Sequence, residues 1–398
     1  MNRRDVGRWG ALAFVLGIAS LRRATPRSRP TPLPAAPTSN ADRAVQAYRA
    51  MQGYFSVPEA PLYREQYPHS GGDGYATLWP FSQALVATLH LVGIPRIGDR
   101  FAPDVADRLA GLARYWNPGL LSGTVFGQAG IPGYASTVVS PLGLAGDLYY
   151  DDNEWIGLAL IQHVRRTEDR SALDRAEQLF RLIVSAWDSD TRHACPGGVF
   201  WTQAIENHDR NTVSTAPAAA LGAHLYELTG QATYRAWAIR MDRWVNECLR
   251  APNGLYWDHL DLDGAVERTQ WSYNQGAMLG LAVSLNRVTD ESAYLDRAAQ
   301  IADAALAYYA PGDRLAAQPV AFNAIFFKNL LRLDAARPDP RYRTTLQRYV
   351  DSLWQQVDPS TGLLRPRPAE AATLLDQAAL VQLCALLAWN PEQYASLA

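Results

Sequence analysis

The feature that most constrains the fold is a series of twelve helix-length segments that follow one another from about residue 41 to the end of the chain. Within each segment, apolar side chains recur at intervals of three and four residues, as on one face of an α-helix. The segments are 41–52, 79–92, 103–115, 152–166, 171–187, 211–229, 231–248, 273–289, 291–309, 320–334, 340–356 and 372–388. No stretch shows the strict alternation of apolar and polar residues that is typical of a β-strand. The sequence therefore predicts an all-α protein.

The short joints between these segments indicate a repeat. Thr167, Thr229 and Thr289 each stand in such a joint, and their spacing of about sixty residues is the length of one helical hairpin with its loops. Six hairpins of similar size predict a closed (α/α)6 barrel. An open α-solenoid is the alternative, although solenoid repeats are shorter and need polar capping repeats.

Composition divides the segments into inner and outer helices. Inner helices are crowded on all sides and favour Ala, Gly and Leu, whereas outer helices keep one charged face toward solvent. By this criterion the segments beginning at 152, 211, 273, 320 and 372 are inner, and those beginning at 171, 231, 291 and 340 are outer. The long connections lead into the N-termini of the inner helices. A closed barrel would therefore gather these N-termini at one mouth.

The first forty residues have a different character. In residues 1–23, Arg3 and Arg4 precede the apolar run Trp9–Leu21. This arrangement is typical of a signal peptide or an N-terminal anchor. Residues 24–40 are rich in Pro, Thr and Arg and are expected to form a spacer. We therefore expect residues 41–398 to be the barrel and catalytic domain, in a protein that is secreted, periplasmic or anchored at the cell surface.

Composition also limits the partners. The chain is 48% hydrophobic and 19% charged, which excludes a mainly disordered protein, and its net charge of −2 does not suit nucleic acid binding. We expect a monomer that contacts membranes only through its N-terminal segment and needs no cofactor or metal. Cys195, Cys248 and Cys384 lack metal-site spacing. The sequence favours three thiols and leaves one disulfide as the alternative.

Aromatic, amide and carboxylate side chains stand where the long connections enter the inner helices. Aromatic rings stack on the apolar faces of sugars, and amides and carboxylates bind sugar hydroxyls, so this combination indicates a glycan site. His208 and His259 also lie in long connections, and ligand contact is the less favoured interpretation for them. The candidate substrate-binding residues are Tyr75, Trp79, Tyr150, Asn153, Trp155, Trp201, Asn211, Tyr273, Asn274, Gln275 and Asp376.

The adjacent pair Asp151 and Asp152 is the clearest candidate for chemistry. Glycoside hydrolysis generally uses two carboxyl groups, one ionised and one protonated. The positive end of a helix keeps one carboxylate ionised, while burial and that negative charge raise the pKa of the other. A purely structural interpretation is a capping box, formed by an N-terminal Asp with Glu154 a few residues later. From the pair alone, both interpretations stay open.

Several of these motifs together resemble glycoside hydrolase family 76, the family of endo-α-1,6-mannanases on an (α/α)6 barrel. The resemblance spans about residues 140–390 and rests on the segments 150–155 (YDDNEW), 273–276 (YNQG), 225–230, 326–330 and 375–379. It implies a retaining mechanism on α-mannan or a mannooligosaccharide, with Asp151 as nucleophile and Asp152 as general acid/base. Two departures concern the exact glycan. Ile156 stands where family members often have a second aromatic residue, and the stretch 210–215 differs from the family's usual Lys-Asn and Ser-Asn pairs.

Three alternatives to an endo-mannanase remain at this stage. A transglycosylase of the same family would use the same pair of aspartates. A sugar epimerase shares the barrel but needs histidines in the cavity, and here these would be His163 or His224. A non-catalytic glycan-binding protein would use the aspartates only as a helix cap.

Overall fold

The computed structural model describes residues 37–69, 74–119, 130–365 and 370–398. Residues 1–23, expected to be a signal peptide or anchor, and most of the expected spacer at 24–40 lie outside the described residues. All twelve predicted helices are present, with bounds that differ from the expected ones by a few residues. The prediction of an all-α fold is therefore confirmed.

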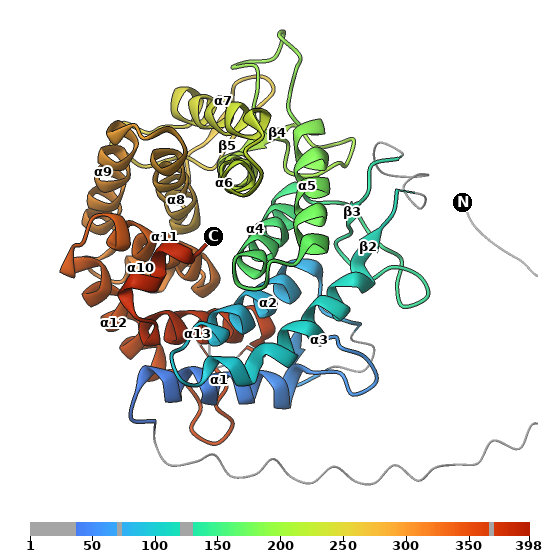
Figure 1. Ribbon diagram of the computed structural model, residues 1–398, viewed down its shortest axis with the longest axis vertical. Helices are drawn as coiled ribbons and strands as arrows, with labels where there is room; N and C mark the ends of the chain where they lie inside the picture. The colour runs from blue at the N-terminus through green and yellow to red at the C-terminus, as the bar shows by residue number, and fades with distance from the viewer. Residues whose placement is uncertain (1–36, 70–73, 120–129, 366–369) are drawn as a thin grey trace, which may run out of the picture. The chain divides into compact units, whose positions relative to one another are not determined.

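Six helices form an inner ring, in which each packs against the next and the last returns to the first (Figure 1). Close approach depends on small residues. A side chain at Gly276 would collide with the backbone of Phe326, and one at Gly157 would collide with the Leu221 side chain. The inner helices are α2 (Leu78–Val92), α4 (Tyr150–Thr167), α6 (Thr212–Thr229), α8 (Ser272–Thr289), α11 (Val320–Ala336) and α13 (Leu374–Ala388).

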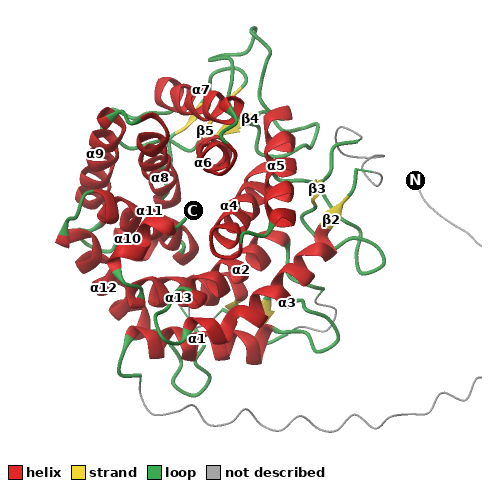
Figure 2. Cartoon of the chain, viewed as in Figure 1, coloured by secondary structure: helices red, strands yellow, loops and turns green. Residues whose placement is uncertain are grey.

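Six further helices surround this ring (Figure 2). The first, α1, packs on the last, α13, and a short pairing of Gln66 with Thr373 and of Tyr67 with Ala372 joins the same two ends of the fold. These contacts close the ring, so the fold is an (α/α)6 barrel and not an open solenoid. The outer helices are α1 (Asn40–Phe55), α3 (Ala102–Leu112), α5 (Arg170–Ser185), α7 (Ala232–Cys248), α9 (Ser292–Tyr309) and α12 (Pro340–Trp354).

The connections hold short strands and turns that the periodicity did not predict, because two or three residues are too few to show an alternation. The strands are β1 (Gln66–Tyr67), β2 (Trp116–Asn117), β3 (Gly133–Tyr134), β4 (Asp209–Asn211), β5 (His259–Asp261), β6 (Val266–Glu267) and β7 (Ala372–Thr373). The short helical turns are η1 (Gly98–Phe101), η2 (Ala113–Tyr115), α10 (Arg314–Ala317) and η3 (Pro391–Ser396). Strands β4, β5 and β6 form an antiparallel sheet that stands beside the N-terminus of α6.

Two cysteines form a disulfide, which corrects the favoured expectation of three thiols. Cys195, in the connection before β4, is bonded to Cys248 at the end of α7. Cys384 is buried and has a free thiol. Spacing along the sequence did not reveal this pair, because the barrel brings together residues of two different hairpins. None of the helices in the described ranges is both long enough and apolar enough to span a bilayer.

Candidate active site

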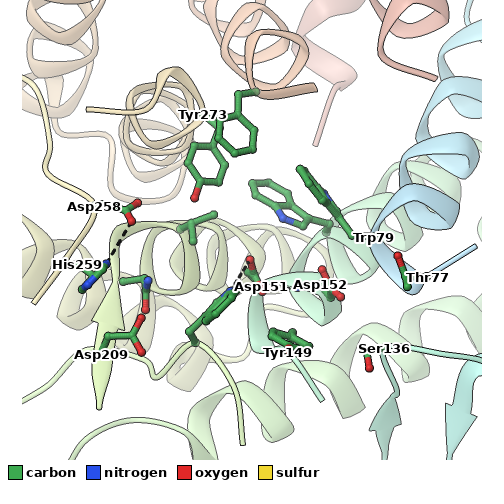
Figure 3. A pocket seen from close by; sticks show the side chains of 15 residues that line it. Thr77, Trp79, Ser136, Tyr149, Asp151, Asp152, Asp209, Asp258, His259 and Tyr273 are labelled. Atoms are coloured by element: carbon green, nitrogen blue, oxygen red, sulfur yellow. Dashed lines mark hydrogen bonds and ion pairs between the residues drawn. The ribbon is translucent and has the colours of Figure 1, made fainter. Parts of the chain in front are cut away.

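A cavity of about 540 Å³ opens at the mouth where the N-termini of the inner helices meet (Figure 3). Its volume lies in the usual range for ligand sites, which is about 300–1,000 Å³. The lining residues come from the starts of five inner helices and from the connections that precede them. They are Thr77, Trp79, Ser136, Tyr149, Asp151, Asp152, Trp155, Trp201, Asp209, Asn211, Val213, Asp258, His259, Tyr273 and Phe322.

The aspartate pair stands in the first turn of α4. The N-cap is Tyr149, whose side chain makes no capping hydrogen bond, so Asp151 and Asp152 are the second and third helical residues. Glu154 is fully buried, and neither of its oxygens has a hydrogen-bond partner among the described residues. The pair and Glu154 therefore do not form a capping box. Both aspartates line the cavity instead.

Asp151 has the contacts that stabilise an ionised carboxylate. The indole Nε1–H of Trp201 donates to its Oδ2 at 3.2 Å, and the backbone N–H of Asp152 donates to its Oδ1 at 2.9 Å. The positive end of α4 acts in the same direction. Burial raises the pKa of Asp151 above its usual range, and these two donors oppose the rise.

Asp152 differs from its neighbour because no group in the described residues donates a hydrogen bond to its carboxyl oxygens. Burial raises the pKa of Asp152 well above its usual range, and the charge of Asp151 raises it further. Of the two carboxyl groups, Asp152 therefore holds a proton more strongly. Asp151 is thus the more readily ionised of the two and Asp152 the more readily protonated, a difference that suits acid-assisted displacement at a sugar carbon.

Glu154 is a third carboxyl group next to the pair, and the sequence analysis considered it only as a cap. Burial, followed by the charge of Asp151, raises the pKa of Glu154 well above its usual range. Both causes favour its neutral form and so oppose a third negative charge beside the pair.

Aromatic side chains cover another part of the cavity wall. The rings of Tyr273 and Phe322 are stacked, with centroids 3.9 Å apart and planes within 5° of each other. Trp79 packs on the same Phe322 ring at 5.9 Å, and its Nε1–H is buried without a partner among the described residues. Trp201, which is 41% exposed, packs against Tyr149. Such faces and a free indole donor suit a pyranose ring.

Five of the predicted substrate-binding residues line the cavity, namely Trp79, Trp155, Trp201, Asn211 and Tyr273. The other six, Tyr75, Tyr150, Asn153, Asn274, Gln275 and Asp376, are absent from its lining. Most of these six have contacts that explain their presence at the helix starts.

Asn153 and Gln275 anchor loops. Each lies four residues after the N-cap of its helix, where the side chain turns inward and reaches the backbone of the preceding connection. The Asn153 amide donates to the Tyr134 carbonyl and accepts from the Tyr134 N–H. Gln275 forms the same two bonds with Tyr256. Gln377 occupies the equivalent position in α13 and binds the loop before it.

The remaining residues outside the lining also have identifiable surroundings. Asn274 is buried directly behind the cavity and donates from Nδ2 to Oδ1 of Asp258 at 3.0 Å. In the first turn of α13, the Asp376 carboxylate accepts a hydrogen bond from the hydroxyl of Thr373, the N-cap, and the Asp376 backbone N–H donates to that hydroxyl. Tyr150 is buried, and Tyr75 packs against the hydrophobic core.

The prediction missed several lining residues, most of them on connections. Asp209, Asp258 and His259 lie at the β4–β5 ribbon, and Thr77 and Ser136 lie across the cavity from them (Figure 3). The only sequence signal for this group was the position of His259 in a long connection. Pairing of two loops about fifty residues apart places these side chains together, and helical periodicity carries no information about it.

The histidines that an epimerase would need lie away from the cavity. His163 faces Asp169 at the other end of α4, and His224 is buried between Arg165 and Arg332. Neither lines the cavity. Within the described ranges, no three His, Cys, Asp or Glu side chains are grouped so that they would hold a metal ion.

Comparison with known proteins gives a consistent result. The sequence profile of glycosyl hydrolase family 76 matches residues 133–360, more than half of the chain. Mannan endo-1,6-alpha-mannosidase DCW1 of Candida glabrata is 26% identical over 231 residues, which are 54% of this chain and 47% of that protein. The chain thus spans about half the length of this curated relative.

Solved structures share the barrel over most of its length. A family 76 glycoside hydrolase from a bovine Bacteroides thetaiotaomicron strain superimposes with a TM-score of 0.76 and 26% identity, covering 88% of this chain and 78% of that one. The alpha-1,6-mannanase of Salegentibacter sp. HEL1_6 gives a TM-score of 0.69 with 21% identity, covering 88% and 99%. That structure is an inactive variant with two consecutive aspartates replaced, in complex with alpha-1,6-mannotetrose.

Proposed function

Because the chain belongs to glycosyl hydrolase family 76, we propose that it is an endo-acting glycoside hydrolase that cleaves α-1,6-linked mannan. The observation that carries this proposal is the position of the aspartate pair within the cavity. Asp151 and Asp152 lie between the group at the β4–β5 ribbon and the group that includes Trp79 and Thr77 (Figure 3). A glycan that contacts both groups of residues lies across the aspartate pair, and one of its internal glycosidic linkages is then next to the two carboxyl groups.

In the first step, the Asp151 carboxylate attacks the anomeric carbon of the mannosyl unit. The bond between that carbon and the glycosidic oxygen breaks, and the oxygen takes the proton of Asp152 as the leaving chain departs. The products are a glycosyl ester on Asp151, an ionised Asp152 and a shortened glycan.

In the second step, the ionised Asp152 takes a proton from a water molecule, and the resulting hydroxyl attacks the anomeric carbon. The ester bond to Asp151 breaks and the carboxylate is restored. Two displacements at the same carbon leave its configuration unchanged, so we propose a retaining enzyme.

The different surroundings of the two aspartates support these roles. A nucleophile must be ionised, and Asp151 receives the Trp201 indole and one backbone donor. A general acid must carry a proton at working pH. Asp152 has no donor among the described residues to stabilise its charge, and its negative neighbour opposes that charge.

We propose further that the protein is exported. Two features support this, the N-terminal basic and apolar segment in residues 1–23 and the Cys195–Cys248 disulfide. Disulfides persist mainly in oxidising compartments outside the cytosol. Cell fractionation with the full chain tests export, and recovery of the folded protein only in the cytosol would contradict it.

The direct test of activity is incubation of the full chain with linear α-1,6-mannan, followed by chromatography of the released sugars. We expect short mannooligosaccharides early in the reaction, as internal cleavage requires, and no release by the Asp151→Asn and Asp152→Asn variants. Asp174→Asn, an exposed residue of α5 paired with Arg170, is the matched control and should act like the wild type. Undegraded mannan with the wild-type protein would contradict the proposal, and hydrolysis by both site variants would reduce the pair to a structural role.

A further inference from the structure

Besides the aspartate pair, the cavity has a group of polar side chains at strands β4 and β5. We call this group the β4–β5 wall, and its members are Asp209, Asn211, Asp258 and His259. Asn211 and His259 are directly paired across the two strands, so their side chains lie on the same face of the ribbon. All four residues line the cavity. Figure 3 shows Asp209, Asp258 and His259 together on one side of the aspartate pair.

A chain of hydrogen bonds fixes the imidazole of His259. The Nδ2–H of buried Asn274 donates to Oδ1 of Asp258 at 3.0 Å, and Oδ2 of Asp258 lies 3.2 Å from Nδ1 of His259. The carboxylate is thus held at both oxygens, and it holds the Nδ1–H of the ring. In the described part of the chain, Nε2 of His259 has no hydrogen-bond partner, and the ring borders the cavity.

Every charged group that acts strongly on this ring is acidic. Asp258 lies next to it, Asp209 and Asp261 lie on β4 and β5, and Glu267 is its cross-strand partner on β6. The hydrogen bond to Asp258 raises the pKa of His259, burial opposes the rise, and the neighbouring carboxylates add to it. No Lys or Arg is among the described residues that line the cavity.

Without a charged His259, the wall offers mainly acceptors. Asp209 is a carboxylate, and Oδ1 of Asn211 is buried without a partner among the described residues. A sugar hydroxyl donates one hydrogen bond and accepts others. A protonated ring adds a charged donor at Nε2 to the amide donor of Asn211, and loss of its proton leaves a lone pair there.

We infer that Asp258 and His259 form a glycan-binding unit, in which the charged ring donates from Nε2 to a hydroxyl of the sugar beside the cleavage point. Glycan affinity then depends on the protonation of His259. The inference rests on the proposed function, because it needs a glycan in the cavity. It assigns His259 to binding and leaves the chemical step to the aspartate pair.

The test is calorimetric titration of α-1,6-mannotetraose into the full-length Asp152→Asn variant, which does not consume the ligand, from pH 5 to pH 9. The protonation of His259 is followed in the same samples by NMR of its ring. We expect the affinity to fall about tenfold as His259 loses its proton, since a hydrogen bond to a charged group contributes about that factor.

Two added substitutions separate a binding role from a structural one. With His259→Gln, binding should be weak and independent of pH, whereas Asp258→Asn should move the transition to lower pH because the partner that holds the ring charge is lost. His208→Gln, which alters an exposed histidine outside the lining, is the control and should keep the parent curve.

Tight binding at all pH values, or a His259→Gln variant that follows the parent curve, would overturn the inference and leave the proposed function intact. Absence of binding at every pH, together with undegraded mannan in the hydrolysis assay, would overturn both.

Discussion

The two ends of the barrel carry side chains of opposite charge. At the mouth, where the inner helices begin, the cavity is lined by Asp151, Asp152, Asp209 and Asp258. At the base, where the inner helices end, cations gather instead. Helix dipoles favour this division, since N-termini stabilise negative charge and C-termini stabilise positive charge.

The ends also differ in how completely their charges are paired. At the base, Glu227 lies between Arg165 at 2.5 Å and Arg287 at 2.9 Å. Arg165 and Arg287 also donate to backbone carbonyls of the segment 391–398, and Lys328 donates to the last residue, Ala398. Figure 1 shows the C-terminus near the centre of the ring of inner helices. At the mouth, Asp152 lacks any donor among the described residues.

The comparison shows where the fold is stabilised and where it keeps reactivity. At the base, Arg165 and Arg287 are paired with Glu227 and with backbone carbonyls of the segment 391–398, and these contacts hold the helices together. At the mouth, the carboxyl group of Asp152 is left without a hydrogen-bond donor among the described residues, which costs stability but keeps it available to a substrate. Substitutions at the mouth should therefore affect rate, and those at the base should affect unfolding.

The largest expected effect is at the mouth. Asp151→Ala should lower kcat on mannan by a factor on the order of 10³ or more, because removal of a nucleophile disables the whole catalytic unit. Added azide should then yield a mannosyl azide of inverted configuration, since azide attacks where the carboxylate is missing. With Asp152→Ala, azide should give the retained product. NMR of the azides distinguishes the two, and equal products would contradict the assigned roles.

At the base, Glu227→Gln should leave kcat unchanged but destabilise the fold by about 3 kcal/mol, because Arg165 and Arg287 would lose a partly buried charged partner. Thermal unfolding measures the loss. An unchanged melting temperature, or a lowered kcat in a folded variant, would remove the distinction between the two ends.

The pH dependence of this loss has a definite sign. Burial alone would raise the pKa of Glu227, but the hydrogen bond to His224 and the charges of Arg165 and Arg287 prevail and lower it to about 2. A depressed folded pKa stabilises the protein above the unfolded value of about 4.3. The stability gap between wild type and variant should therefore be full near pH 6 and shrink as the pH falls from about 4.3 toward 2.

A smaller effect separates loop anchors from binding residues within the mouth itself. Asn153→Leu removes hydrogen bonds to the buried backbone of Tyr134, and we expect a loss of about 2–3 kcal/mol in stability with little change in KM. Asn211→Ala should raise KM and leave the melting temperature nearly unchanged. A raised KM with unchanged stability for Asn153→Leu would contradict this distinction and assign Asn153 to glycan binding.

The smallest expected effect concerns Trp201. Its indole N–H stabilises the ionised form of Asp151, so Trp201→Phe should move the acidic limb of the kcat profile upward by about one pH unit, a shift worth about 1.4 kcal/mol. Phenylalanine keeps an aromatic ring against Tyr149 and removes only the N–H donor, so a change in packing does not explain the shift. An unshifted limb would show that the indole does not tune the pair.

Much of the barrel was predictable from sequence because local patterns determine it. Helical periodicity identified the twelve helices, and Ala, Gly and Leu content identified five of the six inner helices, all except α2. The small residues at Gly157 and Gly276 are there because neighbouring helices approach closely. The pair Asp151 and Asp152 was found from its residue types and position, and the family resemblance strengthened that prediction.

The division of roles among the amides was not predictable. Asn211 is itself an N-cap and borders the cavity, whereas Asn153 lies four residues after an N-cap and faces a buried loop. Each residue turns the helix by 100°, and sequence places a helix start only within one or two residues. The β4–β5 wall was missed because it depends on pairing between distant connections.

The most direct test of the central claim is proton NMR of the anomeric signals during the first minutes of mannan hydrolysis by the full chain. The account predicts that the first product carries the α-configuration and that the β-anomer grows only by later mutarotation. A β-configured first product would contradict it, because direct inversion by water leaves no role for Asp151 as a nucleophile.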